Sequence, residues 1–310
     1  MRTTRLLVAV SSAAILLTAT TTATSTTAAA TTAASAAGQL HHYVALGDSY
    51  TSGPFIPAQR YDPLGCARST ANYPSVVAAA LKPAAFTDVS CAGADTGSMT
   101  RAQQVPLNGT NAPQLDALRI DTDLVTLGLG GNDYGLFGSL TKTCPGLRAG
   151  DPTGNPCEKH FTTNGVDTVT TAITAIQPRI GAVLAAIHQR SPGARVLVVG
   201  YPRIAPESGY CPDILPFADG DYAWLNRVQS DLNAALEDAA ASGDADYVDT
   251  FGPSRGHDAC ARGGSAWING KDLNVFAAAA YHPLKAGMAG MAAVVLKTVA
   301  LKTVVLKTLR

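Results

Sequence analysis

The chain has 310 residues, of which 46% are hydrophobic and 15% charged, and its 23 basic residues balance its 23 acidic ones. A chain of this length and apolar content can form one large globular domain. The balanced charge argues against a nucleic-acid-binding protein, because such proteins present a basic surface that neutralises phosphates.

The amino-terminal stretch has the pattern of a secretory signal peptide. Arg2 and Arg5 precede an apolar run at residues 6–17, and Ala34-Ser35-Ala36 offers a cleavage site of the small-x-small type. The run of about 12 residues is too short for the ~20 that a membrane-spanning helix needs. We expect no later segment to be long and apolar enough to span a membrane.

This pattern divides the chain into two parts. Residues 1–36 are predicted to be the signal peptide, and residues 37–310 are predicted to be a single domain. We expect the mature protein to be soluble, secreted to the extracellular space and monomeric.

Short apolar runs alternate with helical patterns along the rest of the chain. Strands are predicted at residues 43–46, 86–90, 124–129, 194–202 and 246–250, and helices at residues 73–81, 166–188, 222–241 and after Pro283. Strands that are separated by helices pair in parallel. The pattern therefore predicts an α/β protein, a three-layer α/β/α sandwich around a parallel five-stranded sheet.

Two insertions and a repetitive tail interrupt this alternation. Residues 141–160 and 203–218 are rich in Gly, Pro and Asp and are predicted to be surface loops that flank a site. The tail repeats Leu-Lys-Thr at 296, 301 and 306, a five-residue period that fits neither a helix nor a strand. We expect a terminal helix there, and a cationic helix that contacts a membrane is the alternative.

Six cysteines fit an oxidising compartment, where three disulfides persist. Their spacing contains no Cys-x-x-Cys and no close Cys/His pair, so a zinc site is the weaker interpretation. Six cysteines allow about 15 pairings, and pairing neighbours in chain order would close three separate loops. The cysteines are Cys66, Cys91, Cys144, Cys157, Cys211 and Cys260.

Polar or Gly-rich segments follow three predicted strands in succession. They are Gly47-Asp48-Ser49, Cys91-Ala92-Gly93 and Gly130-Gly131-Asn132-Asp133. Because ligands bind at the carboxyl ends of the strands in an open parallel sheet, we expect these segments to meet at one edge. A serine hydroxyl there can attack a carbonyl carbon, and the N–H groups of Ser49 and Gly93 and the amide of Asn132 can donate to the developing oxyanion.

A serine needs a base to act as a nucleophile at neutral pH. His282 stands in AYHPLKAG, on the predicted turn before the last helix. The other histidines lie before the first strand, in a stapled loop or at a helix end, and His257 is the main competitor. These positions favour His282 as the general base.

These blocks resemble the SGNH hydrolases, also called the GDSL esterase and lipase family. The resemblance covers nearly all of the predicted mature chain and implies a flavodoxin-like fold. It also implies Ser49 as the nucleophile, His282 as the general base, and an oxyanion hole formed by Ser49, Gly93 and Asn132. The six cysteines and the signal peptide are similar to those of the secreted actinobacterial lipases and phospholipases. A carboxylic ester hydrolase is therefore implied.

One position departs from the family pattern, which has Asp-x-x-His where this chain has Ala279. A main-chain carbonyl near Ala279 or Ala280 could orient the imidazole and give a Ser-His dyad, and Asp272 could reach back as a more distant carboxylate. Loss of an orienting Asp costs about 10⁴-fold when nothing replaces it. A catalytically disabled binding module is therefore the rival hypothesis.

Other motifs are weaker. Ser254 lies in a Gly-x-Ser-x-Gly sequence, but no helical pattern follows it, as the nucleophile elbow requires. Asp48 and Asp133 are expected to hold loops rather than to act as a glycosidase pair. No cofactor and no metal are expected. The substrate is expected to be a lipid or a small ester, with transient contact to a lipid interface, and the pattern leaves lipase, phospholipase A1 and esterase open.

Overall fold

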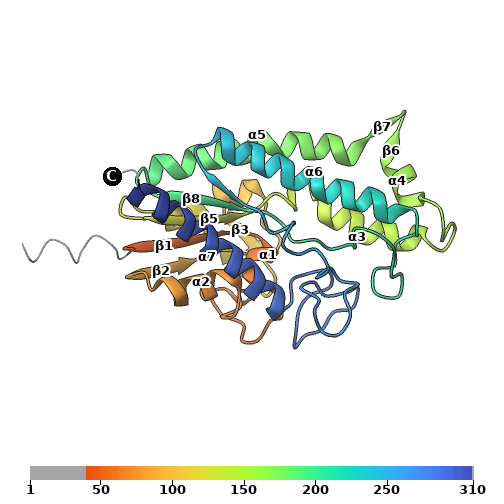
Figure 1. The fold of residues 1–310 in the computed structure, drawn as a ribbon, viewed down its shortest axis with the longest axis horizontal. Helices are drawn as coiled ribbons and strands as arrows, with labels where there is room; N and C mark the ends of the chain where they lie inside the picture. The colour runs from red at the N-terminus through yellow and green to blue at the C-terminus, as the bar shows by residue number, and fades with distance from the viewer. Residues whose placement is uncertain (1–39, 309–310) are drawn as a thin grey trace, which may run out of the picture. The chain divides into compact units, whose positions relative to one another are not determined.

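Five parallel strands form the central sheet of residues 40–308, the part of the chain that the computed structural model describes. In spatial order they are β2 (Ala85–Asp88), β1 (His42–Gly47), β5 (Leu124–Gly128), β8 (Arg195–Val199) and β9 (Asp246–Val248). All neighbours pair in parallel, which confirms the predicted sheet (Figure 1). The strand order reverses at β1, and ligands bind beside such a switch point in open α/β sheets.

The predicted signal peptide, its cleavage site and the start of the predicted domain at residue 37 lie outside the described residues.

The strands are apolar without alternation because both faces of the sheet are covered. All residues of β1 and β5 are buried. Along β1, Val44 and Leu46 belong to one hydrophobic cluster, whereas Tyr43 and Ala45 belong to the other. The two clusters are the cores on the two sides of the sheet, as expected from the alternating direction of side chains along a strand.

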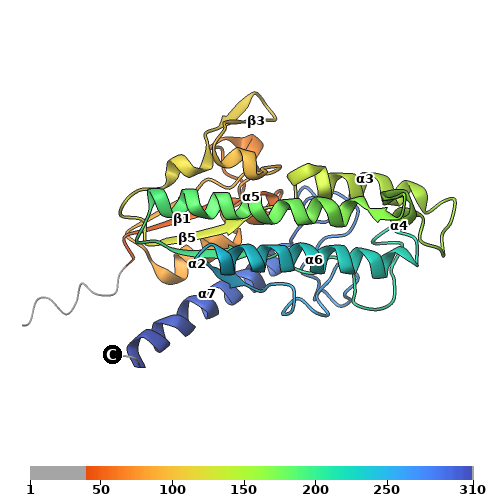
Figure 2. The same ribbon diagram turned by 90° about the horizontal axis from the view of Figure 1, so that it is seen from above.

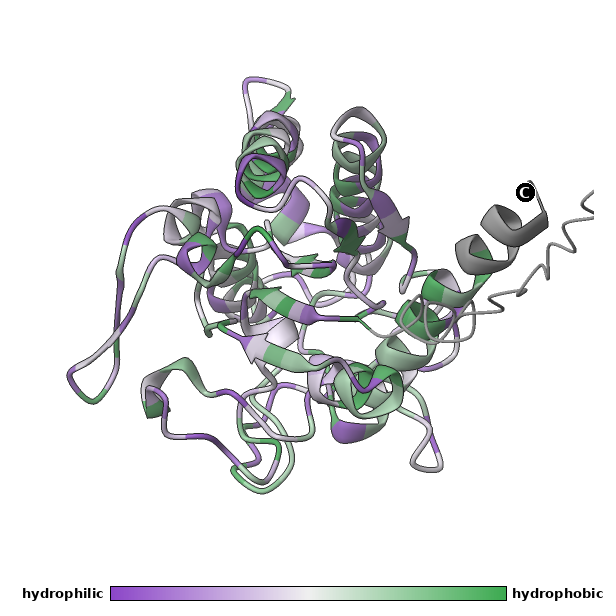
Figure 3. Ribbon diagram, turned by 90° about the vertical axis from the view of Figure 1, so that its left-hand side faces the viewer, coloured by the Kyte–Doolittle hydropathy of each residue, from purple (hydrophilic) through white to green (hydrophobic). Residues whose placement is uncertain are grey.

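Two pairs of helices make the outer layers. One pair is α5 (Thr168–Arg190) and α6 (Asp221–Ser242), which run side by side (Figure 2). The other pair is α2 (Tyr73–Leu81) and α7 (Lys285–Thr308), which pack together on the opposite face. Seen from one end of the sheet, the largely hydrophobic strands lie between these layers (Figure 3). The predicted α/β/α sandwich is confirmed.

The ends of these helices follow from local sequence. Asp167 precedes α5, and its carboxylate accepts hydrogen bonds from the N–H groups of Val169 and Thr170. Asn72 caps α2 in the same way through Ser75. Such side chains satisfy N–H groups that the first helical turn leaves without partners.

Helix α5 corrects one expectation. It is long and apolar enough to cross a membrane by length and composition alone, although we expected no such segment. Its apolar face, which includes Ile176, Ile180 and Leu184, is buried in the core on the α6 side of the sheet. A core helix of an α/β domain passes the same test, so α5 is explained by its packing.

Smaller elements occupy the connections. They are α1 (Ser49–Ser52), α3 (Leu136–Leu147), α4 (Pro156–Phe161), the hairpins β3 (Gln103–Val105) with β4 (Gly109–Asn111) and β6 (Thr162–Thr163) with β7 (Val166–Asp167), and the 3₁₀ turns η1 (Leu64–Cys66), η2 (Thr96–Met99), η3 (Gln114–Ala117) and η4 (Asp133–Gly135). The sequence patterns did not predict the two hairpins.

The prediction of a loop at residues 141–160 was wrong for most of that segment, because α3 and α4 occupy it. Leu136, Leu140 and Cys144 recur every four residues and form a buried face of α3. The periodicity begins before residue 141, so the Gly and Pro content of the later part concealed it. At the carboxyl end of the chain, the tail with the Leu-Lys-Thr repeats continues α7 to Thr308.

The six cysteines form three disulfides between neighbours in chain order. The pairs are Cys66 with Cys91, Cys144 with Cys157, and Cys211 with Cys260. Each closes a separate loop and lowers the entropy of the unfolded chain, which stabilises the folded state by about 3–4 kcal/mol in the chain-entropy model. The first of them joins the segment after α1 to the segment after β2, beside Gly93.

Candidate active site

The three polar segments meet at the carboxyl edge of the sheet, as predicted. The N–H of Asp48 donates to the carbonyl of Gly128 at 3.0 Å, and the N–H of Cys91 donates to the carbonyl of Gly47 at 2.9 Å. The side-chain amide of Asn132 donates to the carbonyl of Ala94 at 2.9 Å. Direct bonds therefore link the segments that follow β1, β2 and β5.

Ser49 is the first residue of α1, immediately beyond the end of β1. The turn that presents it requires glycine at position 47, because a Cβ there would lie 2.6 Å from the carbonyl oxygen of Gly128. Asp48 caps the turn by accepting a hydrogen bond from the N–H of Tyr50. Ser49 is 7% exposed and lines a cavity.

His282 and Ser49 are in hydrogen-bonding contact. The Nε2 atom of His282 lies 2.8 Å from Oγ of Ser49, and its Nδ1 atom lies 2.7 Å from the carbonyl oxygen of Ala280. A carbonyl oxygen can only accept, so Nδ1 carries the hydrogen and Nε2 is left to accept from the serine hydroxyl. This arrangement can take a proton from Ser49.

Burial keeps the imidazole neutral. The rings of Tyr50 and Phe137 lie 5.2 and 5.3 Å from the imidazole, centroid to centroid. Burial lowers the pKa of His282 to about 4, and the hydrogen bond to Ala280 opposes this shift without cancelling it. A base is useful only when it is unprotonated, and His282 is so across the neutral range.

The orienting group is the Ala280 carbonyl, one of the two anticipated. The alternative, Asp272, was wrong: its side chain is exposed, and its carboxylate pairs with the ammonium of Lys271 at 3.4 Å. Within residues 40–308, no carboxylate is hydrogen-bonded to His282.

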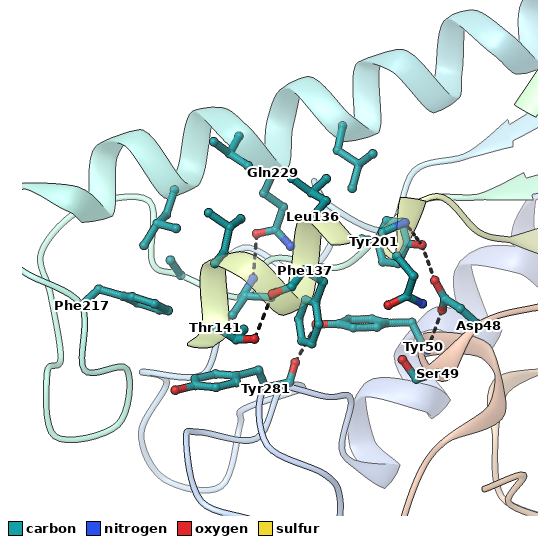
Figure 4. A pocket seen from close by; sticks show the side chains of 18 residues that line it. Asp48, Ser49, Tyr50, Leu136, Phe137, Thr141, Tyr201, Phe217, Gln229 and Tyr281 are labelled. Atoms are coloured by element: carbon teal, nitrogen blue, oxygen red, sulfur yellow. Dashed lines mark hydrogen bonds between the residues drawn. The ribbon is translucent and has the colours of Figure 1, made fainter. Parts of the chain in front are cut away.

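A buried network that the sequence did not reveal supports this edge of the sheet. The hydroxyl of Tyr201 donates to Oδ2 of Asp48 at 2.5 Å and accepts from the N–H of Gly131 at 2.8 Å (Figure 4). Burial raises the pKa of Asp48 to about 7, although the bond from Tyr201 acts in the opposite direction. Tyr201 lies two positions beyond the last residue of β8, Val199, so a polar side chain just past a buried strand was the available signal.

The predicted oxyanion donors lie in the linked segments. Gly93 is exposed and has φ of +77°, a left-handed conformation that favours glycine. Asn132 lines the cavity, and only one of its two amide hydrogens is needed for Ala94. Asp133 accepts hydrogen bonds from the N–H and hydroxyl of Thr96, which fastens the loop after β5 to the segment after Gly93.

An apolar cavity extends from Ser49 between α3, α6 and two loops (Figure 4). The cavity is open to solvent on one side rather than fully enclosed. Its apolar walls include Leu136, Phe137, Leu140, Ile204, Phe217, Leu225, Val228, Leu232 and Tyr281. Such a cavity suits the hydrocarbon part of a ligand.

The competing residues have structural roles. Ser254 is fully buried, and its hydroxyl accepts from the N–H of Arg203 and donates to the carbonyl of Phe251. His257 is bonded to the carbonyl of Ser265 and stacks on Trp267. Across the described part of the chain, no three His, Cys, Asp or Glu side chains are grouped so that they could hold a metal.

An open parallel sheet with a serine, a histidine and an apolar cavity at its switch point is typical of the α/β ester hydrolases. Residues 45–289 match the model of the GDSL-like lipase/acylhydrolase family, and the chain belongs to that family.

Relatives of this chain are named as lipases and esterases. It is 42% identical over 234 residues to Lipase 2 of Streptomyces coelicolor, covering 73% of this chain and 75% of that protein. It is 33% identical over 248 residues to an esterase of Streptomyces scabiei, covering 70% and 72% of the two chains. The chain is a carboxylic ester hydrolase.

Two solved structures share the fold. Phospholipase A1 from Streptomyces albidoflavus has a TM-score of 0.66 at 29% identity, and an extracellular lipase from Streptomyces rimosus has a TM-score of 0.64 at 28% identity. Both comparisons cover 83% of this chain and 99% of the other.

Proposed function

We propose that this protein is a secreted serine esterase that hydrolyses acyl esters of lipids through an acyl-enzyme on Ser49. The observation that carries the proposal is the hydrogen-bonded series from Ser49 through His282 to the Ala280 carbonyl, in which Ser49 lines an apolar cavity. The three disulfides and the predicted signal peptide support export to the extracellular space.

In the first half of the reaction, Oγ of Ser49 attacks the ester carbonyl carbon while its proton moves to Nε2 of His282. The carbonyl oxygen becomes an oxyanion, which the N–H groups of Ser49 and Gly93 and the amide of Asn132 stabilise. The tetrahedral intermediate then collapses, and the departing alcohol takes the proton from His282. Ser49 is left carrying the acyl group.

In the second half, water replaces the alcohol. His282 takes a proton from the water as it attacks the acyl carbon, and the second tetrahedral intermediate releases the carboxylic acid. The proton returns from His282 to Oγ of Ser49. The Ala280 carbonyl accepts a hydrogen bond from Nδ1 throughout, which fixes the tautomer of the neutral imidazole and stabilises the charged form when His282 is protonated.

The cavity supports an acyl chain as the apolar part of the substrate. Its wall is built from aliphatic and aromatic side chains of α3, α6 and adjacent loops. The relatives named as lipase and phospholipase A1 are consistent with lipid esters, and the head group is left open.

Turnover of nitrophenyl esters of short, medium and long acyl chains tests the proposal. Ser49→Ala is expected to lose on the order of 10³-fold or more of kcat, because it removes the nucleophile. Ser254→Ala is the matched control and should retain its turnover per folded molecule. Loss of turnover in folded Ser254→Ala with activity retained in Ser49→Ala would overturn the assignment.

A serine-directed phosphonate separates the enzyme from the rival, a disabled binding module. Wild-type protein should gain one phosphonyl group, and mass spectrometry should locate it on the peptide that contains Ser49. Folded protein that stays unlabelled and inactive would favour the binding module.

A further inference from the structure

A hairpin-like loop, residues 268–283, carries His282 at its base. Ile268 and Pro283 form an antiparallel bridge. The N–H of Asn269 donates to the carbonyl of His282, and the N–H of Tyr281 donates to the carbonyl of Gly270, both at 2.9 Å. These hydrogen bonds join the two ends of the loop, and one of them is made by the main chain of His282, the proposed general base.

The loop is held in shape by its own polar groups. The amide of Asn269 donates to the carbonyls of Asp272, Ala278 and Ala279 at 2.8 to 3.2 Å. Near the tip, the N–H and carbonyl groups of Asn274 and Ala278 pair in both directions. The tip is therefore presented in a defined position.

The tip presents hydrophobic side chains to solvent. Leu273 is 56% exposed, Val275 50% and Phe276 82%. The neighbouring loop adds Tyr210 and Ile214, which are 59% and 42% exposed. We call these five residues the apolar rim.

The two loops of the apolar rim are joined to each other. The N–H of Lys271 donates to the carbonyl of Ile214 at 2.9 Å, and the Lys271 ammonium donates to the carbonyl of Asp213. Lys271 also pairs with the carboxylate of Asp272 at 3.4 Å, so the exposed carboxylate of Asp213 leaves a net charge of only −1 at the foot of the tip. A near-neutral apolar surface suits an uncharged or zwitterionic lipid interface.

Both loops of the apolar rim also contribute a side chain to the cavity wall. Phe217 lies on the same loop as Ile214, and Tyr281 lies on the same loop as Phe276; both line the cavity that begins at Ser49 (Figure 4). In Figure 1, the blue loops before α7 lie at the end of the sheet where β1 leads into α1. An acyl chain that leaves a lipid surface beside the rim would therefore meet the cavity wall directly.

We propose that the apolar rim docks on a lipid surface, with the tip at Leu273, Val275 and Phe276 inserted among the lipid chains. This inference rests on the proposed function, because it takes lipid esters as the substrate. A lipid surface is favoured over a protein partner because the rim and the acyl cavity share the same two loops. Docking would bring the cavity mouth and His282 to the interface where the substrate lies.

Vesicle binding tests docking without turnover. Ser49→Ala protein should sediment with phosphatidylcholine vesicles, and the addition of Leu273→Ser, Val275→Ser and Phe276→Ser should weaken binding at least tenfold. Ile120→Ser is the matched control, since Ile120 is 77% exposed but precedes β5 at the opposite edge of the sheet. Equal binding by the triple variant and the control would overturn the proposal.

Enzyme activity supplies the second readout, measured on variants in which Ser49 is intact. The triple variant should keep its turnover of a monomeric short-chain nitrophenyl ester and lose at least tenfold on phosphatidylcholine in mixed micelles. If the triple variant lost equally on both substrates, the substitutions would have affected His282 rather than docking, and the inference would be refuted. A single Phe276→Ser variant that behaves like wild type in both vesicle binding and micelle turnover would also refute it. If the wild type hydrolysed neither substrate, the proposed function would fail while vesicle binding still decided docking.

Discussion

Replacing Tyr201 by phenylalanine removes one oxygen atom that serves two buried partners. The N–H of Gly131 would lose its acceptor, and Oδ2 of Asp48 would lose its donor. Leaving a buried polar group without a partner costs about 1–3 kcal/mol. With two such groups, Tyr201→Phe should lower the free energy of unfolding by about 2–6 kcal/mol.

The cost should depend on pH because Asp48 titrates. Burial raises the pKa of Asp48 to about 7, above its unfolded value, so the folded protein binds the extra proton between about pH 4 and 7. The contribution of Asp48 to stability thus falls as pH rises through this window. At pH 5 the variant loses a bond to a neutral acid, whereas at pH 8 it loses one to a carboxylate, which is worth about 1 kcal/mol more.

Urea unfolding at pH 5 and pH 8 measures this difference, with Tyr61→Phe as the control because Tyr61 is 84% exposed. The Tyr201→Phe variant should lose more stability at pH 8 than at pH 5, and addition of Asp48→Asn should abolish the difference. An equal loss at the two pH values, or a loss below about 0.5 kcal/mol, would refute the role given to the network. Tyr201→Phe should also lower kcat on a soluble ester while KM stays nearly constant, because loss of the hydrogen bond to Gly131 would shift the adjacent Asn132, a proposed oxyanion donor.

Three further predictions concern the proposed reaction. Because burial lowers the pKa of His282 to about 4, kcat/KM of an Asp48→Asn variant, in which Asp48 no longer titrates, should decline only as pH falls through about 4; a decline centred near 6.5 in that variant would contradict the buried base. Asn132→Ala should lower kcat on the order of 10²-fold to 10³-fold with the fold intact by circular dichroism, and an unchanged kcat would remove Asn132 from the oxyanion hole. Val228→Phe, which adds volume to the cavity wall, should lower kcat/KM about tenfold for long-chain nitrophenyl esters and leave the acetate unaffected; an equal effect on both would place the acyl chain elsewhere.

The sheet and the position of Ser49 were predictable because they depend on local pattern. Unbroken apolar runs between helices specify a parallel sheet, and parallel strands bring the residues after their carboxyl ends together. Ser49, Gly93 and Asn132 could therefore be assigned to one edge before any contact was known.

Features that depend on contacts distant in sequence were not predictable. Tyr201 reaches Asp48 across 153 positions, and a single chain gives no pattern for that pairing. The choice between the Ala280 carbonyl and Asp272 depends on the path of the loop around Asn269. The cavity walls come from α3 and α6, whose spacing is a property of the packed structure.

The orienting group of His282 has a consequence for how the active site tolerates mutation. In the proposed mechanism the third member of the catalytic series is a peptide carbonyl, and every residue type at position 280 supplies one. No exchange of the side chain there deletes the orienting oxygen, as an exchange of an aspartate would. The position of this oxygen depends instead on the path of the main chain. Tyr281 adopts a left-handed conformation with φ of +61°, and the hydroxyl of Tyr50 donates a 2.6 Å hydrogen bond to the Tyr281 carbonyl. A small side chain at residue 280, which packs against the core, should therefore be exchangeable without loss of the orienting oxygen, whereas changes that alter this turn should be selected against.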